Sequence, residues 1–186
     1  MMPQQIAPHP IHTIGHSTRA LPAFIALLQG AAIEQLVDIR TVPRSRTNPQ
    51  FNQDSLPAAL RAHGIEYVHL TALGGLRPAS KTISPDVNGF WENASFHHYA
   101  DYAMGREFQQ GLDTLIGLAR QRRCAIMCAE AVWWRCHRRI VSDYLLAQGI
   151  AVSHIMGPDH GVPATLTRGA RVQPDGTLRY PPASEH

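Results

Sequence analysis

Five short apolar runs alternate with segments of helical periodicity, and this alternation constrains the fold more than any other feature of the chain. The predicted strands are residues 11–14, 33–39, 65–70, 124–128 and 150–155. The predicted helices are residues 21–29, 55–63, 94–104, 106–122 and 136–148. Strands separated by helical crossovers predict an α/β protein with a mostly parallel sheet of about five strands. With helices on both faces, this is a Rossmann-like, three-layer fold.

The two ends of the chain differ from this core. Residues 1–10 contain three prolines, which predicts a flexible arm, and residues 11–186 are expected to form a single domain. Within that domain we expect a core over about 11–160 and a C-terminal extension over about 161–186. In the extension, Asp175 and Gly176 stand between two short extended runs. An Asp-Gly pair in that position predicts a small β-hairpin.

Composition excludes several broad classes. The 186 residues are 44% hydrophobic and 17% charged, which is enough apolar material for a packed core. No apolar run reaches the roughly 18 residues of a membrane-spanning helix. The first residues lack the basic and apolar regions of a secretory signal, and three cysteines are too few and odd in number for a disulfide scaffold. We therefore expect a cytoplasmic protein with no membrane association.

Chemically versatile side chains follow the ends of the predicted strands. If the strands are parallel, their carboxyl ends meet at one edge of the sheet, where ligands bind in open α/β folds. The candidate catalytic residues are Cys128, Glu130, Cys136, His137, Asp38 and His16. The candidate substrate- or anion-binding residues are Ser17, Arg40, Arg44, Ser45, Arg46, Gly74, Gly75 and Arg138. No residue is assigned as a metal ligand.

The densest group of these residues lies between Cys128 and Arg139. Cys136 falls near the start of a predicted helix, with basic residues on either side. The N–H groups of a helix N-terminus attract anions and lower the pKa of a thiol. Either Cys128 or Cys136 could therefore act as a thiolate nucleophile, with His137 or His16 as its base. The alternative is that Cys128 is a buried core thiol, which is common for cysteine.

Other candidates also have structural interpretations. Asp38 could pair with an arginine near the end of its strand. Gly74 and Gly75 could be required only for a turn of positive φ. Ser17 or Thr18 could cap the first helix.

Positive charge is concentrated in one part of the chain. Of the 17 basic residues 16 are arginines, and residues 119–139 hold six of them against one acid. A genome that favours arginine codons would explain the imbalance. A second explanation is that arginine forks bind carboxylate or phosphate groups bidentately. A third is a nucleic-acid-binding surface over residues 120–139.

The motifs taken together resemble one family. The chain is similar to the uncharacterised bacterial and archaeal family numbered 488 among the domains of unknown function, over residues 13 to about 155. The matching segments are TIGHS at 13–17, DIR at 38–40 with Pro43 and Ser45, LGG at 73–75, CAE at 128–130 and CHR at 136–138. The resemblance implies an α/β fold that carries these motifs at one site. It implies no established reaction.

The leading hypothesis is an enzyme, or a binder, of a small anionic substrate that bears a phosphate or a nucleotide. The anion would lie over the start of the helix near Cys136, held by Arg138 and Arg40. The nucleophile would be Cys128 or Cys136, or Glu130 would act as general base. Arg44 and Arg46 would close over the substrate from a loop.

Three alternatives remain open at this point. The first is a metal- or haem-binding protein that uses Cys128, Cys136 and histidine ligands. The second is a non-catalytic nucleic-acid-binding module, and the third is a structural network of ion pairs. The sequence assigns no cofactor and no oligomeric state.

Overall fold

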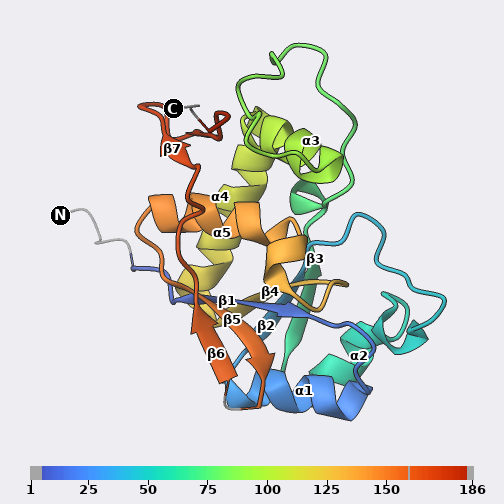
Figure 1. The fold of residues 1–186 in the computed structure, drawn as a ribbon. Coiled ribbons are helices and arrows are strands. Elements are labelled where there is room, and N and C mark those ends of the chain that lie inside the picture. Colours follow the sequence, from blue (N-terminus) through green and yellow to red (C-terminus); the bar gives the residue numbers. More distant parts are fainter. Residues whose placement is uncertain (1–5, 159, 184–186) are drawn as a thin grey trace.

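A six-stranded sheet forms the centre of the molecule in the computed structural model, which describes residues 6–158 and 160–183 (Figure 1). Its strands lie in the order β3-β2-β4-β1-β5-β6. They are β1 (Ile11–Gly15), β2 (Gln35–Asp38), β3 (Glu66–His69), β4 (Cys124–Cys128), β5 (Val152–Gly157) and β6 (His160–Pro163). β1 to β5 pair in parallel, so the parallel sheet predicted from the alternation is confirmed. β6, which pairs antiparallel with β5, was not predicted.

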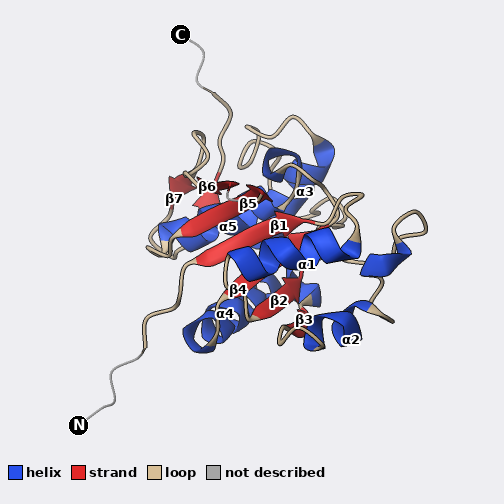
Figure 2. Cartoon of the chain, turned by 90° about the horizontal axis from the view of Figure 1, so that it is seen from below, coloured by secondary structure: helices blue, strands red, loops and turns tan. Residues whose placement is uncertain are grey.

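Helices cover both faces of the sheet (Figures 1 and 2). The helices are α1 (Leu21–Gly30), α2 (Leu56–Arg61), α3 (Ala94–Ala103), α4 (Arg106–Gln121) and α5 (Arg138–Ala147). Single 3-10 turns lie at Pro49–Phe51, Thr71–Leu73 and Trp133–Arg135. α1 and α2 pack on one face and α3, α4 and α5 on the other, so that the three-layer prediction is confirmed.

β4 shows how the buried strands position the site. All five of its residues are buried, as expected for a parallel strand covered on both faces. Ala125 and Met127 belong to the core under α1 and α2, whereas Cys124 and Ile126 belong to the core under α4 and α5. Because side chains alternate along a strand, Cys128 continues the second set and faces the side of the sheet that α5 covers.

The start of α1 differs from the prediction that Ser17 or Thr18 caps it. Its N-cap is Ala20, which makes no side-chain capping bond, and a proline occupies the first turn, where its missing N–H is not needed. Ser17 instead adopts a left-handed conformation with φ 49°. Its backbone N–H donates to the carbonyl of Ala129, 3.0 Å away, which ties the chain beyond β1 to the chain beyond β4.

The predicted C-terminal hairpin is present as β7 (Arg171–Val172) and β8 (Leu178–Arg179). The turn is stabilised by the Asp175 carboxylate, which accepts a hydrogen bond from the Thr177 N–H at 3.0 Å. Beyond β8, the fully buried Tyr180 donates its hydroxyl to the Asp143 carboxylate of α5 at 2.9 Å. The extension therefore packs against the helical layer and contributes to the core.

The predicted arm and extension reach beyond the described residues. Residues 1–5 and 184–186 lie outside them, and the proposed division into arm, core and extension remains a prediction. In the described part of the arm, the backbone N–H of His9 donates to the carbonyl of Ala119, 2.9 Å away. Over residues 6–158 and 160–183, no helix combines the length and the apolar character needed to cross a membrane.

Candidate functional site

A cavity of about 390 Å³ opens at the carboxyl edge of the sheet. The loops after β2, β3 and β4 form most of its wall, and the start of α3 completes it. Because β2 and β4 are neighbours in the sheet, their end loops meet at this point. The lining residues are Arg40, Thr41, Val42, Arg44, Gly75, Leu76, Asn93, Ser95, Phe96, Cys128, Ala129, Glu130, Arg135, Cys136 and His137.

The Cys136 sulfur is surrounded by donors. α5 begins at Arg138, two residues later than predicted, so Cys136 lies just before the helix rather than at its first residue. The sulfur accepts the backbone N–H of Arg138 at 3.3 Å and the Arg138 Nε–H at 3.4 Å. His137 Nδ1 lies 3.5 Å from it and the Cys128 sulfur 2.6 Å from it. The two Arg138 donors favour negative charge on this sulfur, and His137 does so once its Nδ1 carries a proton.

Arg138 provides the strongest argument for a Cys136 thiolate. Its side chain is fully buried, and its remaining donors reach two neutral oxygens, the Thr13 hydroxyl at 3.1 Å and the Glu130 carbonyl at 2.7 Å. Within residues 6–158 and 160–183, no carboxylate forms an ion pair with it. A buried cation without an anion is costly. A thiolate at Cys136 would supply that anion.

The two thiols have opposite pKa shifts. Burial by itself raises the pKa of Cys136, but the hydrogen bond from Cys128, the neighbouring His137 and the Arg138 charge outweigh burial and hold that pKa well below its ordinary value. For Cys128, burial and the adjacent Cys136 sulfur raise the pKa well above its ordinary value. The two shifts favour ionisation of Cys136 before Cys128.

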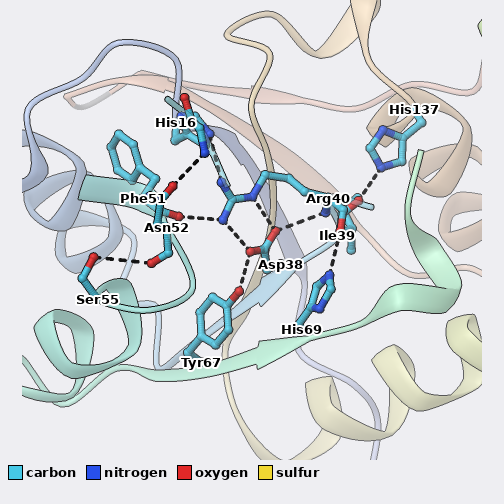
Figure 3. A network of polar contacts seen from close by, with 11 residues as sticks. His16, Asp38, Ile39, Arg40, Phe51, Asn52, Ser55, Tyr67, His69 and His137 are labelled. Atoms are coloured by element: carbon cyan, nitrogen blue, oxygen red, sulfur yellow. Dashed lines mark hydrogen bonds and ion pairs between the residues drawn. The ribbon is translucent and has the colours of Figure 1, made fainter. Parts of the chain in front are cut away.

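His137 is oriented so that its Nδ1 faces Cys136. Its Nε2–H donates to the carbonyl of Ile39, 2.8 Å away, which leaves Nδ1 free to take up a proton from the thiol (Figure 3). Gly75 makes room for the ring, because a Cβ at this position would lie 2.6 Å from His137 Nδ1. Neither Gly74 nor Gly75 has a positive φ, so the turn explanation for this pair is wrong. These glycines are explained by close packing instead.

Asp38 and Arg40 form a buried ion pair next to the cavity (Figure 3). Arg40 Nε–H and Nη2–H donate to the two oxygens of Asp38 at 2.9 and 2.7 Å, and Tyr67 donates its hydroxyl to the same carboxylate. Asp38 is fully buried and does not line the cavity. Arg40 also donates to the Phe51 carbonyl at 2.7 Å, so most of its N–H groups are already engaged. The pairing of Asp38 with an arginine, considered from the sequence, is present.

His16 belongs to this ion-pair network and not to the thiols. Its ring stacks on Phe51 with centroids 4.4 Å apart, and its Nδ1–H donates to the Ser17 carbonyl at 2.8 Å. The other ring nitrogen, Nε2, therefore accepts from Arg40 Nη1 at 3.4 Å. Burial lowers the pKa of His16 and the Arg40 charge acts in the same direction, whereas the hydrogen bond to the Ser17 carbonyl and the Asp38 charge oppose the shift. His137, and not His16, contacts Cys136.

Two exposed arginines stand at the rim of the cavity. Arg44 comes from the loop after β2, where it makes a long contact of 3.4 Å with the exposed Asp54. Arg135 comes from the 3-10 turn before α5 and is exposed to solvent. Glu130 adds a carboxylate on the same rim. The rim of the cavity therefore carries two long cationic side chains and one carboxylate.

Half of the fourteen predicted site residues line the cavity. These are Cys128, Glu130, Cys136, His137, Arg40, Arg44 and Gly75. The other seven lie outside its lining: Asp38, His16, Ser17, Ser45, Arg46, Gly74 and Arg138. Asp38, His16 and Arg138 contact residues of the lining. Ser45 stabilises the loop after β2, because its hydroxyl accepts the Asn48 N–H at 3.0 Å. Arg46 is exposed on that loop.

Part of the wall was missed by the sequence analysis. The long segment after β3 and the start of α3 contribute Leu76, Asn93, Ser95 and Phe96. Thr41 holds this segment in place, since its hydroxyl accepts the Leu76 N–H at 2.8 Å. The length of the segment between β3 and α3 was the available signal, because long ordered loops in compact domains are often functional.

The arrangement bears on the two main alternatives. The arginines of residues 120–139 do not share one exposed surface, because Arg138 is buried and Arg139 lies over the Trp91 ring. Arg122 and Arg123 precede β4, at the opposite edge of the sheet from Arg135. Over the described part of the chain, no group of three or more His, Cys, Asp or Glu side chains could hold a metal ion.

Comparison with known proteins agrees with the motifs. The model of a family described as domain of unknown function DUF488 matches residues 20–145, which is 126 of the 186 residues. The chain belongs to this family. The matched range includes the DIR, LGG, CAE and CHR segments, whereas the TIGHS segment at 13–17 lies before it. No curated protein and no solved structure matches the chain.

Proposed function

We propose that this DUF488 protein is a cytoplasmic enzyme that attacks a small anionic substrate with the Cys136 thiolate. The observation that carries the proposal is the fully buried Arg138, whose Nε–H and backbone N–H both point at the Cys136 sulfur without a carboxylate partner among the described residues. A thiolate stabilised in this way and open to a cavity is the usual form of a cysteine nucleophile.

The other lining residues have roles that follow from their positions. His137 can hold the proton that Cys136 gives up, because its Nδ1 faces the sulfur. Arg44 and Arg135 at the rim would bind the phosphate or carboxylate of the substrate. Glu130, the one acid of the lining, would act as a general base. The apolar side chains Val42, Leu76 and Phe96 would contact the rest of the substrate.

Alkylation of Cys136 tests this function directly. Wild-type protein is treated with iodoacetamide across pH 5 to 9, and modification of each cysteine is followed by mass spectrometry. We expect the pH at which Cys136 reaches half of its maximal alkylation rate to lie below roughly 8.5, the pKa of an ordinary cysteine. This pH is the alkylation midpoint of Cys136. Pyrophosphate and adenosine monophosphate are added as anions that the cavity could bind, and at least one of them should slow the alkylation of Cys136. Ordinary reactivity at Cys136 with no protection by either compound would contradict the proposal.

Two double variants test whether the rim arginines are responsible for the protection by anions. Arg44→Gln/Arg135→Gln should lose most of the protection of Cys136 from alkylation, while the alkylation midpoint of Cys136 changes little. The double variant Arg61→Gln/Arg122→Gln removes the same charge from exposed positions outside the cavity lining and should keep the protection. Equal loss in both pairs would mean that net charge, and not the rim, attracts the anion.

A further inference from the structure

The two cysteines of the site are close enough to react with each other. Cys128 ends β4 and Cys136 precedes α5, and their sulfur atoms lie 2.6 Å apart as free thiols. A disulfide bond has an S–S length of about 2.05 Å, so bond formation needs little movement of either side chain. Both cysteines also belong to the lining of the cavity.

The surroundings give the two sulfurs different roles. Cys136 receives two hydrogen bonds from Arg138 and faces His137, which favours the thiolate that attacks first. Cys128 has one further polar neighbour, the Glu130 carbonyl oxygen, which lies 3.8 Å from its sulfur. An anionic cysteine beside a protonated one is the arrangement of a nucleophilic and a resolving thiol.

We propose that Cys136 and Cys128 form a dithiol–disulfide couple that reduces the disulfide of a small, carboxylate-bearing thiol. This inference rests on the proposed function for the thiolate and for the cationic rim. A sulfur electrophile is the substrate class that needs both cysteines, because an adduct on Cys136 is then released by Cys128. The rim arginines Arg44 and Arg135 bind the carboxylates of such a substrate.

The reaction balances with no other reactant. The Cys136 thiolate attacks one sulfur of the substrate RS–SR, its S–S bond breaks, and RS⁻ leaves. Cys128 then attacks the Cys136 sulfur of the mixed disulfide, its proton goes to the second leaving group, and RSH departs. The two cysteines lose two electrons and form one disulfide, and the substrate gains those electrons as one thiolate and one thiol.

Peptide mapping of the intact wild-type chain after incubation with oxidised glutathione is the first experiment. We expect a peptide that links Cys128 to Cys136, with two equivalents of glutathione released per chain. Cys124, which is fully buried and 3.6 Å from the Arg122 carbonyl, should stay reduced. The variant Cys124→Ser is the matched control and should form the same link. Absence of the link, or a stable glutathione adduct on wild-type Cys136, overturns the proposal.

Trapping and charge reversal test the order of attack and the substrate class. Cys128→Ser should accumulate a glutathione adduct on Cys136, whereas Cys136→Ser should accumulate far less on Cys128. Oxidised glutathione should oxidise the wild type about tenfold faster than cystamine, a dicationic disulfide, because of the cationic rim. Equal rates for the two probes overturn the carboxylate-bearing class.

The two proposals fail separately. If pyrophosphate protects Cys136 from alkylation but no Cys128–Cys136 link forms with any disulfide, the thiolate site stands and the dithiol couple is wrong. If Cys136 has ordinary reactivity and is not protected by anions, the proposed function is wrong, whatever disulfide forms.

Discussion

Gly75 illustrates how a single residue controls the chemistry of the site. Its missing side chain leaves the space that the His137 ring occupies, and that ring faces the Cys136 sulfur. From the sequence, Gly75 was assigned to anion binding or to a turn. Its position in the structure indicates a third role, that of admitting the His137 ring next to the Cys136 sulfur.

The variant Gly75→Ala tests this role. A Cβ would lie 2.6 Å from His137 Nδ1, so the ring must move and the Cys136 thiolate loses its contact. We expect the alkylation midpoint of Cys136 to rise and its rate at neutral pH to fall about tenfold for each unit of that rise. Gly117→Ala in α4, where the added Cβ meets open space, is the control and should not change the rate. An unchanged Cys136 rate in Gly75→Ala would contradict the role.

At the scale of elements, the Asp38 carboxylate joins β2 to β3. Asp38 ends β2 and binds Arg40, while Tyr67 of β3 donates to the same carboxylate. Burial and the Asp38 charge raise the pKa of Tyr67, so its hydroxyl remains a donor at all ordinary pH values. The network fixes the loop that carries Arg40, Thr41 and Arg44 into the cavity wall.

Breaking this network should cost stability in proportion to the charge left behind. Asp38→Asn leaves the nearly buried Arg40 without its anion and should lower the free energy of unfolding by about 3 kcal/mol or more. Tyr67→Phe removes one hydrogen bond and should cost about 1–2 kcal/mol. Urea unfolding of both variants measures the difference. If the two substitutions cost the same, the ion pair is not the main contribution.

Across the whole molecule, His154 connects β5 to β1 and to the segment before α5. It is almost fully buried, its Nδ1 lies 2.6 Å from the Thr13 hydroxyl of β1, and its ring stacks on Trp133. Burial lowers the pKa of His154 to about 4, with the Arg138 charge acting in the same direction and Cys136 opposing it. The native state therefore keeps this ring neutral.

This pKa makes a prediction about acid stability. The unfolded chain binds a proton at His154 near the ordinary value of 6.5, whereas the native chain binds it near 4. Between pH 6.5 and about pH 4 the unfolded state binds more protons than the native state. The free energy of unfolding therefore falls as the pH is lowered through this range, by on the order of 3 kcal/mol in total. His154→Gln should lose this part of the pH dependence. The variant His63→Gln, at an exposed position, should retain it. The measurement is the free energy of unfolding in urea as a function of pH, and the same pH dependence in both variants would contradict the assignment to His154.

The sequence by itself determined the order of elements, the parallel sheet and the edge at which the motifs meet. Apolar runs of strand length and helical periodicity are local properties, and a parallel sheet brings all strand ends to one side. The strands and helices were therefore predicted with boundary differences of one or two residues in most cases. β6 was missed because it pairs as a short antiparallel return after β5, which leaves no apolar run to detect.

Only the tertiary structure decided how the charges at that edge are paired. The sequence could not distinguish Arg40, which is engaged by Asp38, from Arg44 and Arg135 at the rim. Nor could it show that Arg138 donates to the Cys136 sulfur. It also could not choose between His16 and His137 as the partner of the thiol. Burial and contact depend on packing between segments far apart in the chain, and those two quantities set the charge of a thiol.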